Sequence, residues 1–166
     1  MSSEPVKAIF LDRDGVINEE RGDYTWLLED FRINPGVVEA LRQWQADGYL
    51  LIIISNQGGV AKGIYAKKDV DYLHLHLERS LSNQGIRLTA IYYCPHHPHS
   101  GLCICRKPDS LLLEKACARF GIDPSVSYFI GDTQRDMDAA IKAGIHPVKI
   151  NPNDPLTTVL ARIKKA

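Results

Sequence analysis

The 166-residue sequence has no excess of either charge, because 20 Lys and Arg residues balance 20 Asp and Glu residues. A protein that binds nucleic acid or an anionic membrane over a broad surface needs a basic excess, so the balance argues against both partners. Apolar residues make up 45% of the chain and charged residues 24%, as in globular rather than disordered proteins. The composition therefore predicts a globular protein with no nucleic-acid or membrane partner.

The sequence also lacks a long apolar run. A segment that spans a bilayer needs roughly 20 apolar residues, whereas the longest candidate here covers only residues 49–54. Residues 1–7 include Glu4 and Pro5 and have no signal-peptide pattern, so we expect a cytoplasmic protein. The length matches one domain, and we expect residues 1–166 to form a single domain that needs no disulfide or metal merely to fold.

Cysteine is scarce, and three of the four cysteines lie in the segment 94–105. Without a secretion signal, this crowding favours metal binding over disulfides. Three thiolates and one imidazole complete a tetrahedral zinc site with no open position, which is a structural arrangement. The ligands that we expect are Cys94, His96, Cys103 and Cys105. His97 and His99 are alternatives for the imidazole, and unmetallated thiols in a loop are the other interpretation of the segment.

Apolar strands and amphipathic helices alternate along the chain. Strands are expected at residues 6–11, 50–54, 88–93, 126–130 and 147–150, and helices at 37–44, 70–81, 110–120, 136–143 and 156–164. The strands are uniformly apolar, as expected when both faces of a sheet are covered. We therefore expect a three-layer α/β domain around a mostly parallel central sheet, with residues 94–108 as a zinc-bound loop.

Two carboxylates follow the first expected strand, where such folds carry their chemistry. Asp12 and Asp14 are so close in sequence that one pKa should rise unless a cation lies between them. An Asp-Gly turn with two solvated acids gives the same pattern. The functional alternative is a Mg²⁺ site, since this ion prefers oxygen ligands, with one Asp as nucleophile and the other as acid/base.

Further polar residues stand at other strand ends. The loop after the second strand begins with Ser55 and is rich in glycine, which suits a phosphate but is also ordinary loop composition. Asp132 follows the fourth strand, where an acid is either a helix cap or a metal ligand. Arg106 and Lys107 precede an expected helix, where positive charges interact unfavourably with the helix dipole. Either they bind an anion, or they are a solvated basic pair.

Together these strand ends indicate phosphoryl transfer. When a carboxylate attacks a phosphate, an anion meets an anion, so Mg²⁺ and a Lys must offset the charge. The sequence supplies acids, a hydroxyl and a Lys at one expected edge of the sheet.

The motifs resemble those of the haloacid dehalogenase superfamily of aspartate phosphatases. The matching segments, in family order, are 12–18 (Asp-Arg-Asp-Gly-Val-Ile-Asn), 55–57 (Ser-Asn-Gln), 107–108 (Lys-Pro) and 131–132 (Gly-Asp), with Asp136 beyond. The resemblance covers nearly the whole chain and implies the three-layer Rossmann-like fold of that superfamily. No segment between the motifs is long enough for a separate cap domain.

The resemblance also implies a role for each matching residue. Asp12 resembles the nucleophile, which becomes phosphorylated, and Asp14 resembles the acid/base. Ser55 and Lys107 resemble the residues that stabilise the phosphoryl group. The Mg²⁺ ligands implied in this way are Asp12, Asp14 (through its backbone carbonyl) and Asp132, and Asp136 resembles a supporting acid.

The cysteine loop narrows the resemblance to the heptose bisphosphate phosphatases, with histidinol phosphatases as the nearest alternative. Residues 56–63 (Asn-Gln-Gly-Gly-Val-Ala-Lys-Gly) and 18–22 resemble the heptose group. This implies removal of the 7-phosphate from D-glycero-D-manno-heptose 1,7-bisphosphate, in the synthesis of nucleotide-activated heptose for lipopolysaccharide or other surface glycans. A zinc-stabilised binding module without catalysis is an alternative of another class, and the presence of the full catalytic set argues against it.

The substrate contacts implied by the resemblance are less closely matched. The expected substrate-binding residues are Glu20, Arg21, Gly22, Asp23, Asn56, Gln57, Gly58, Arg106 and Thr133. Ser55 and Thr133 stand where relatives often have Thr and Lys, and residues 20, 21 and 23 depart from the usual pattern. The Arg106 guanidinium suits a second phosphate. Because one chain holds every motif, we expect a monomer that acts on a small-molecule sugar bisphosphate.

Overall fold

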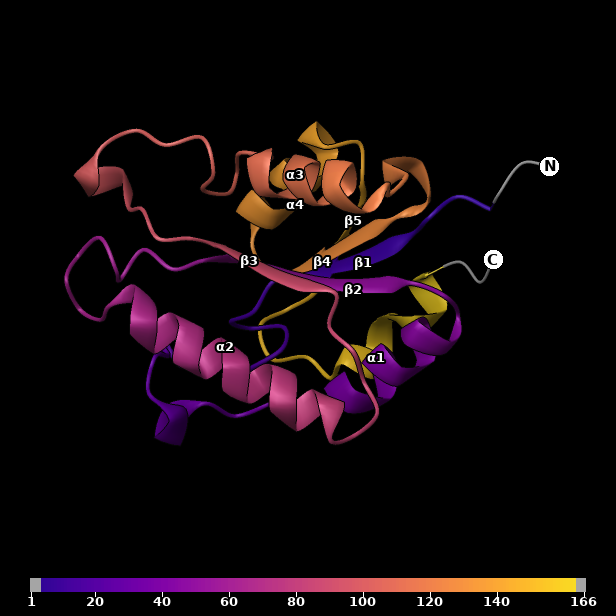
Figure 1. The fold of residues 1–166 in the computed structure, drawn as a ribbon, viewed down its shortest axis with the longest axis horizontal. Coiled ribbons are helices and arrows are strands. Elements are labelled where there is room, and N and C mark those ends of the chain that lie inside the picture. Colours follow the sequence, from indigo (N-terminus) through magenta and orange to yellow (C-terminus); the bar gives the residue numbers. More distant parts are fainter. Residues whose placement is uncertain (1–3, 164–166) are drawn as a thin grey trace.

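A computed structural model describes residues 4–163, which form a parallel sheet between two layers of helices (Figure 1). The strands are β1 (Ala8–Leu11), β2 (Leu50–Asn56), β3 (Ala90–Cys94), β4 (Tyr128–Gly131) and β5 (His146–Lys149). Their order is β3-β2-β1-β4-β5, and each neighbouring pair in this sheet is parallel. The predicted α/β class with a mostly parallel sheet is confirmed.

Each face of the sheet carries its own apolar core, because side chains alternate across a strand. Ile9 and Leu11 of β1 lie in one core, whereas Phe10 lies in the other. The first core is covered by α1 (Val37–Ala46), α2 (Lys67–Ser82) and a 3₁₀ helix, η4 (Leu156–Arg162). The second is covered by α3 (Leu111–Phe120) and α4 (Gln134–Lys142). Figure 1 shows these two layers below and above the sheet.

The last predicted helix, 156–164, differs from the structure. Residues Leu156–Arg162 form a 3₁₀ helix rather than an α-helix, and residue 164 lies outside the described residues. Leu156 and Val159 are both buried and stand three residues apart, which matches the three-residue turn of a 3₁₀ helix. The β-branched pair Thr157 and Thr158 between them also disfavours the α-helix.

The connections near the carboxyl edge of the sheet are loops with short 3₁₀ turns. These turns are η1 (Leu28–Asp30) and η2 (Pro98–Ser100), whereas η3 (Pro124–Val126) precedes β4 at the opposite edge. Between β1 and α1 there is only η1, so this connection carries no separate cap domain. None of the helices within residues 4–163 is both long and apolar enough to cross a membrane.

Sheet register brings three motif-bearing strand ends together. Leu11 of β1 is paired with Ile53 of β2 on one side and with Ile130 of β4 on the other. The next residue, Asp12, donates its backbone N–H to the carbonyl of Ile130 at 3.0 Å. The polar residues that follow β1, β2 and β4 therefore emerge at one edge of the sheet.

Candidate active site

A cleft of about 510 Å³ opens at this edge. Most of the predicted site residues line it: Asp12, Asp14, Glu20, Gly22, Asp23, Asn56, Gly58, Arg106, Lys107, Asp132 and Thr133. Asp136 lines it as well. Residues that are far apart in sequence thus converge on one cavity, as the motif pattern predicts.

Lys107 is buried between two carboxylates at the base of the cleft. Its side chain is 3% exposed, and its Nζ lies 2.8 Å from Oδ1 of Asp12 and 2.6 Å from Oδ1 of Asp136. Nζ also donates to the carbonyl of Ile54 at 2.9 Å. Burial opposes the charge of Lys107, but the two carboxylates outweigh it and raise the pKa of this ammonium group. The cation is therefore fixed beside Asp12.

The backbone of Lys107 is held by the end of β2. Asn56 accepts from the Lys107 N–H at 3.0 Å and donates its own amide to the Lys107 carbonyl at 3.1 Å. Asn56 lines the cleft, but both ends of its side-chain amide are engaged in this pairing. Asn56 thus joins β2 to the loop that carries the buried cation.

Asp12 and Asp132 form an acidic centre that suits a divalent cation. Burial raises the pKa of Asp12 well above its usual range, against the opposing effect of Lys107. Burial and the neighbouring Asp136 likewise raise the pKa of Asp132. Oδ1 of Asp132 is buried without a hydrogen-bond partner. Carboxylates that are costly to ionise, with one unpartnered oxygen, fit a hard cation such as Mg²⁺.

Asp136 belongs to the same acidic group but is already engaged. Ligand oxygens of Asp12, Asp132 and Asp136 lie within 4.8 Å of one another. One oxygen of Asp136 contacts Lys107, and the other accepts from the backbone N–H and the hydroxyl of Thr133 at 3.1 and 2.8 Å. Thr133 and Asp136 form the capping box of α4. Asp136 is therefore placed to orient Lys107 and to begin α4.

Two glycines make room for these acids. A Cβ on Gly15 would collide with the carboxylate of Asp132, and a Cβ on Gly131 would collide with the side chain of Asp136. Gly15 also has a φ of 85°, in the left-handed region that favours glycine. The turn after β1 and the end of β4 thus depend on missing side chains.

Asp14 lines the cleft but lies in a different hydrogen-bond network from Asp12. Its Oδ1 accepts from Arg13 Nη2 at 2.8 Å and from Asn18 Nδ2 at 3.0 Å, and its Oδ2 accepts from Gln57 Nε2 at 3.0 Å. Its side chain is outside the group formed by the other three acids. The implied metal contact through its backbone carbonyl stays a prediction.

Ser55 and Gln57 lie beneath the cleft. Ser55 is fully buried, and its hydroxyl accepts from Gln57 Nε2 at 2.8 Å. Gln57 is 2% exposed and contacts Asp14, Ser55 and Tyr65 rather than lining the cavity. Its predicted contact with substrate is therefore replaced in this structure by contacts with the site's own residues.

Arg13 is a buried cation that the motif analysis left without a role. It is 1% exposed, and its Nη2 donates to Asp14 and to the Thr25 carbonyl, the latter at 2.6 Å. Its Nη1 lies 3.3 Å from Nε2 of His74 on α2. Burial and the Arg13 charge lower the pKa of His74 to about 3, so this imidazole is neutral. In the sequence, the position of Arg13 between Asp12 and Asp14 was the signal that could have indicated its role.

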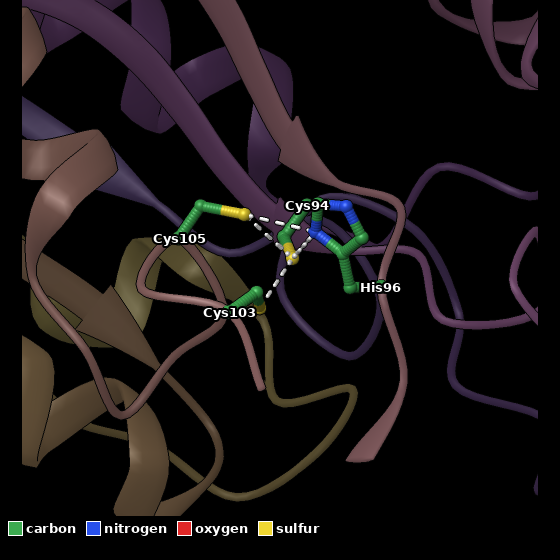
Figure 2. Close-up of side chains that lie close together, drawn as sticks. All are labelled: Cys94, His96, Cys103 and Cys105. Carbon is green, nitrogen blue, oxygen red and sulfur yellow. Dashed lines mark hydrogen bonds between the residues drawn. The ribbon is translucent and has the colours of Figure 1, made fainter. Parts of the chain in front are cut away.

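The predicted zinc ligands converge at the end of β3 (Figure 2). Cys94 Sγ lies 3.0 Å from Cys105 Sγ and 3.7 Å from Cys103 Sγ. His96 Nδ1 lies 3.5 Å from Cys94 Sγ and 3.2 Å from Cys105 Sγ. Ligands around a tetrahedral zinc ion are spaced by about 3.5 Å. The three cysteines form no disulfide, and together with His96 they lie close enough to share one zinc ion.

The structure also distinguishes among the three histidines of this loop. His96 lies in the cysteine group, whereas His97 Nδ1 accepts from the backbone N–H of His99 at 3.2 Å. The His97 ring stacks near that of His99 and lines the cleft. The geometry thus favours His96 as the imidazole ligand.

Some cleft residues depart from the sequence-based set. Arg21 does not line the cavity and instead pairs with Asp30 at 3.0 Å. The cavity is also lined by Tyr24, Thr25, His97 and Arg135, which the motif analysis did not select as substrate contacts. Arg135 lies in the first turn of α4, two residues after Thr133, so its proximity to the fourth motif was the signal that could have identified it.

Residues 7–144 match the haloacid dehalogenase-like hydrolase family. The chain belongs to this family. Among curated relatives of this haloacid dehalogenase-like hydrolase is the D-glycero-beta-D-manno-heptose-1,7-bisphosphate 7-phosphatase of Haemophilus ducreyi, 39% identical over 96% of this chain and 85% of the relative. The enzyme of the same name from Escherichia coli K12 is 36% identical over 93% of this chain and 84% of the relative.

Solved structures agree with the curated relatives. The D,D-heptose 1,7-bisphosphate phosphatase of B. bronchiseptica, crystallised with magnesium and phosphate, superposes with a TM-score of 0.82 at 32% identity, covering 95% of this chain and 87% of that one. The predicted superfamily and phosphatase class are thus confirmed. Neither histidinol phosphatase nor a non-catalytic module is favoured by these relatives.

Proposed function

We propose that this haloacid dehalogenase-like hydrolase is a Mg²⁺-dependent phosphatase that removes the 7-phosphate of D-glycero-D-manno-heptose 1,7-bisphosphate. The observation that carries the proposal is the convergence of Asp12, Lys107 and Asp132 on one cleft. The names of the relatives above support the substrate and favour its β anomer. The reaction serves the synthesis of nucleotide-activated heptose for surface glycans.

The chemistry proceeds in two steps. A carboxylate oxygen of Asp12 attacks phosphorus, the bond between phosphorus and the C7 oxygen breaks, and Asp14 gives its proton to the leaving oxygen. Asp14 then takes a proton from water, whose oxygen attacks the aspartyl phosphate and releases inorganic phosphate. Asp12 is regenerated as a carboxylate, and Asp14 is protonated again.

The groups that would hold the catalytic cation are the carboxylates of Asp12 and Asp132 and the backbone carbonyl of Asp14. When bound, Mg²⁺ offsets the repulsion between the phosphate and the attacking carboxylate. Lys107 contributes a second positive charge, already fixed 2.8 Å from Asp12. Ser55 lies beneath the cleft, and we assign its buried hydroxyl to stabilising the phosphoryl group from that side. Asp136 acts by holding Lys107 in place.

A structural zinc ion at Cys94, His96, Cys103 and Cys105 orders the loop 94–108. The cluster begins at the last residue of β3, and Cys105 directly precedes Arg106 and Lys107. Fixing Cys105 therefore fixes the start of the segment that delivers both cations to the cleft. Arg106 Nη1 also donates to the His96 carbonyl at 3.0 Å, which ties its side chain to the same cluster.

Recognition of the remainder of the substrate falls to the rim of the cleft. Arg106 contacts the second phosphate, and Arg135 adds a further positive charge to the same cavity. Glu20, Gly22, Asp23, Gly58 and Thr133 line the rim where sugar hydroxyls would lie. Arg21 does not line the rim itself, and its ion pair with Asp30 holds the loop that carries Glu20, Gly22 and Asp23. One chain supplies all of these groups, so we propose that the protein acts as a monomer. We also propose that it acts in the cytoplasm.

The deciding experiment compares steady-state kinetics on the two anomers of heptose 1,7-bisphosphate, on fructose 1,6-bisphosphate and on histidinol phosphate. The expected result is Mg²⁺-dependent release of one phosphate, with the highest kcat/KM on a heptose bisphosphate. A higher kcat/KM on histidinol phosphate, or turnover that is unaffected by Mg²⁺ removal, would contradict the proposal.

A further inference from the structure

Gln57 is buried at the junction of two groups that the proposed mechanism uses. Its Nε2 donates one hydrogen bond to Asp14 Oδ2 at 3.0 Å and another to Ser55 Oγ at 2.8 Å. These two bonds use both protons of the amide nitrogen. The amide can make them only if its nitrogen, rather than its oxygen, faces Asp14.

Tyr65 provides the group that favours this orientation. Its hydroxyl donates to Oε1 of Gln57 at 2.7 Å, on the opposite side of the amide from Asp14. Burial raises the pKa of Tyr65 to about 12, so the phenol keeps its proton under ordinary conditions. A reversed amide would present Oε1 to the carboxylate of Asp14, with two acceptors face to face. The hydrogen bond from Tyr65 to Oε1 therefore favours the orientation of the Gln57 amide in which Nε2 faces Asp14.

The Tyr65 ring is itself fixed by the loops that border the cleft. It is 5% exposed, stacks on Trp26 with ring centroids 5.9 Å apart, and meets the edge of Tyr24 at 5.8 Å. Gly59 lies so close to the ring that a Cβ there would collide with it. These contacts hold the ring in the position from which its hydroxyl reaches Gln57.

Asp14 is held from both sides as a result. Arg13 and Asn18 occupy Oδ1, whereas Oδ2 depends on Gln57. Arg13 and Asn18 come from the same turn as Asp14, so among the described contacts of this carboxylate only that of Gln57 comes from the loop that follows β2. Loss of that contact would release the one restraint that comes from outside the turn.

We propose that Tyr65 is a positioning residue for Asp14, acting through Gln57: its hydroxyl fixes the amide so that Nε2 holds the Asp14 carboxylate where it meets the leaving oxygen. This inference rests on the proposed role of Asp14 as the acid. It assigns a function to a tyrosine that lies beneath the cleft and does not line it.

The test is Tyr65→Phe, which removes the hydroxyl and keeps the ring. We expect kcat/KM to fall about tenfold on the best sugar phosphate, whose alkoxide must be protonated as it leaves, with KM nearly unchanged. On p-nitrophenyl phosphate, whose leaving group needs no proton, we expect a fall of less than about twofold. An equal loss on both substrates, or no loss on either, would overturn the role of Tyr65.

A double-mutant cycle tests whether Tyr65 acts through Gln57. Gln57→Met removes the amide at similar volume and should show the same difference between the two substrates. Adding Tyr65→Phe to Gln57→Met should then change kcat/KM by less than about twofold, because the amide is gone. A full additional loss in the double variant would contradict the inference. If Tyr65→Phe does not fold, an equal loss on both substrates in Gln57→Met overturns the inference, because Asp14 would then not depend on the amide through which Tyr65 acts.

The matched control is Tyr92→Phe. The Tyr92 hydroxyl accepts from Arg119 Nη1 at 3.3 Å, away from the cleft residues, so its removal should leave both substrates unaffected. The comparison of two leaving groups uses whichever sugar phosphate the wild-type protein hydrolyses best. A wrong heptose assignment would therefore appear as altered substrate preference in the wild type, whereas a wrong role for Tyr65 appears only in the variants.

Discussion

Nζ of Lys107 lies 2.8 Å from Oδ1 of Asp12, although 95 residues separate the two in the chain. The contact joins the end of the central strand β1 to the loop that begins at the cysteine cluster. Asp136 holds the same Nζ from α4 at 2.6 Å. A buried cation between two carboxylates thus connects three separate elements at the point where phosphorus would be attacked.

Asp12→Asn should abolish phosphatase activity while preserving the fold. The amide cannot serve as the attacking carboxylate, so we expect kcat to fall by more than about 10³-fold. Lys107 keeps its contacts with Asp136 and Ile54, so the buried ammonium stays paired. Phosphate release, circular dichroism and zinc content measure the three expectations. Substantial turnover by this variant would remove Asp12 from the role of nucleophile.

Lys107→Met should destabilise the metal-free protein. Removal of the ammonium leaves Asp12 and Asp136 buried without their shared cation, at a cost of about 3–5 kcal/mol in the free energy of unfolding. Added Mg²⁺ should recover part of this loss, because it supplies positive charge to the same acids. Denaturant unfolding with and without Mg²⁺ measures both effects.

The control for this variant is Lys142→Met. Lys142 pairs with Asp109 at 3.2 Å, but both side chains are 50% exposed. An exposed pair contributes less than about 1 kcal/mol, so the control should unfold nearly as the wild type does. Similar losses for the two variants would mean that the buried contacts of Lys107 carry no special weight.

His74 should make the stability depend on pH. Its pKa is lowered to about 3 in the folded protein, against an ordinary value of 6.5. As pH falls below 6.5, His74 binds a proton in the unfolded chain but stays neutral in the folded chain. The free energy of unfolding therefore decreases as pH falls below 6.5. The contribution between pH 7 and pH 5 is about 2 kcal/mol.

His74→Gln checks this expectation, since glutamine keeps an acceptor for Arg13 but does not titrate. The difference in unfolding free energy between pH 7 and pH 5 should be smaller in this variant by about 2 kcal/mol. His76→Gln, on the exposed side of the same helix, should retain the wild-type pH dependence. An unchanged dependence in His74→Gln would show that folding does not lower the pKa of this imidazole.

Zinc removal should lower both stability and activity. Cys103→Ser should reduce bound zinc to well below one per chain and lower Tm, because the loop 94–108 loses the ion that orders it. Activity should fall as well, since Lys107 follows the cluster directly. Cys117→Ser on α3 removes a thiol outside the cluster and should keep full zinc content. Full activity and an unchanged Tm after chelation would refute the structural role of zinc.

Arg106→Ala should weaken the preference for a bisphosphate. Its guanidinium lines the cleft and is anchored on the His96 carbonyl, so its removal should raise KM for the bisphosphate and leave KM for the matching monophosphate nearly constant. The ratio of kcat/KM values for the two substrates measures the effect. The same ratio in wild type and variant would exclude Arg106 as the ligand of the second phosphate.

Residues at strand ends were predictable because the apolar pattern locates the strands and parallel strands share an edge. Asp12, Ser55 and Asp132 could be placed together in this way, and sheet register does bring their strand ends side by side. The grouping of the three cysteines was predictable from chemistry alone, since a shared metal is the usual reason for three thiols in one short loop. Only the choice among three neighbouring histidines needed coordinates.

Side chains that act through other side chains were not predictable. Gln57 fits a substrate-binding motif, yet its contacts are with Asp14, Ser55 and Tyr65. Arginine is normally a surface residue type, yet Arg13 is buried, with its guanidinium beside His74 of α2. Such contacts depend on which loop packs against which helix, and a pattern of apolar spacing carries no information about that.

The space occupied by Asp132 and Asp136 exists because residues 15 and 131 have no Cβ. Alanine, ordinarily the mildest replacement, is therefore the wrong one at these two positions. A methyl group at either position would have to displace Asp132 or Asp136, even though every acid of the motifs would still be present.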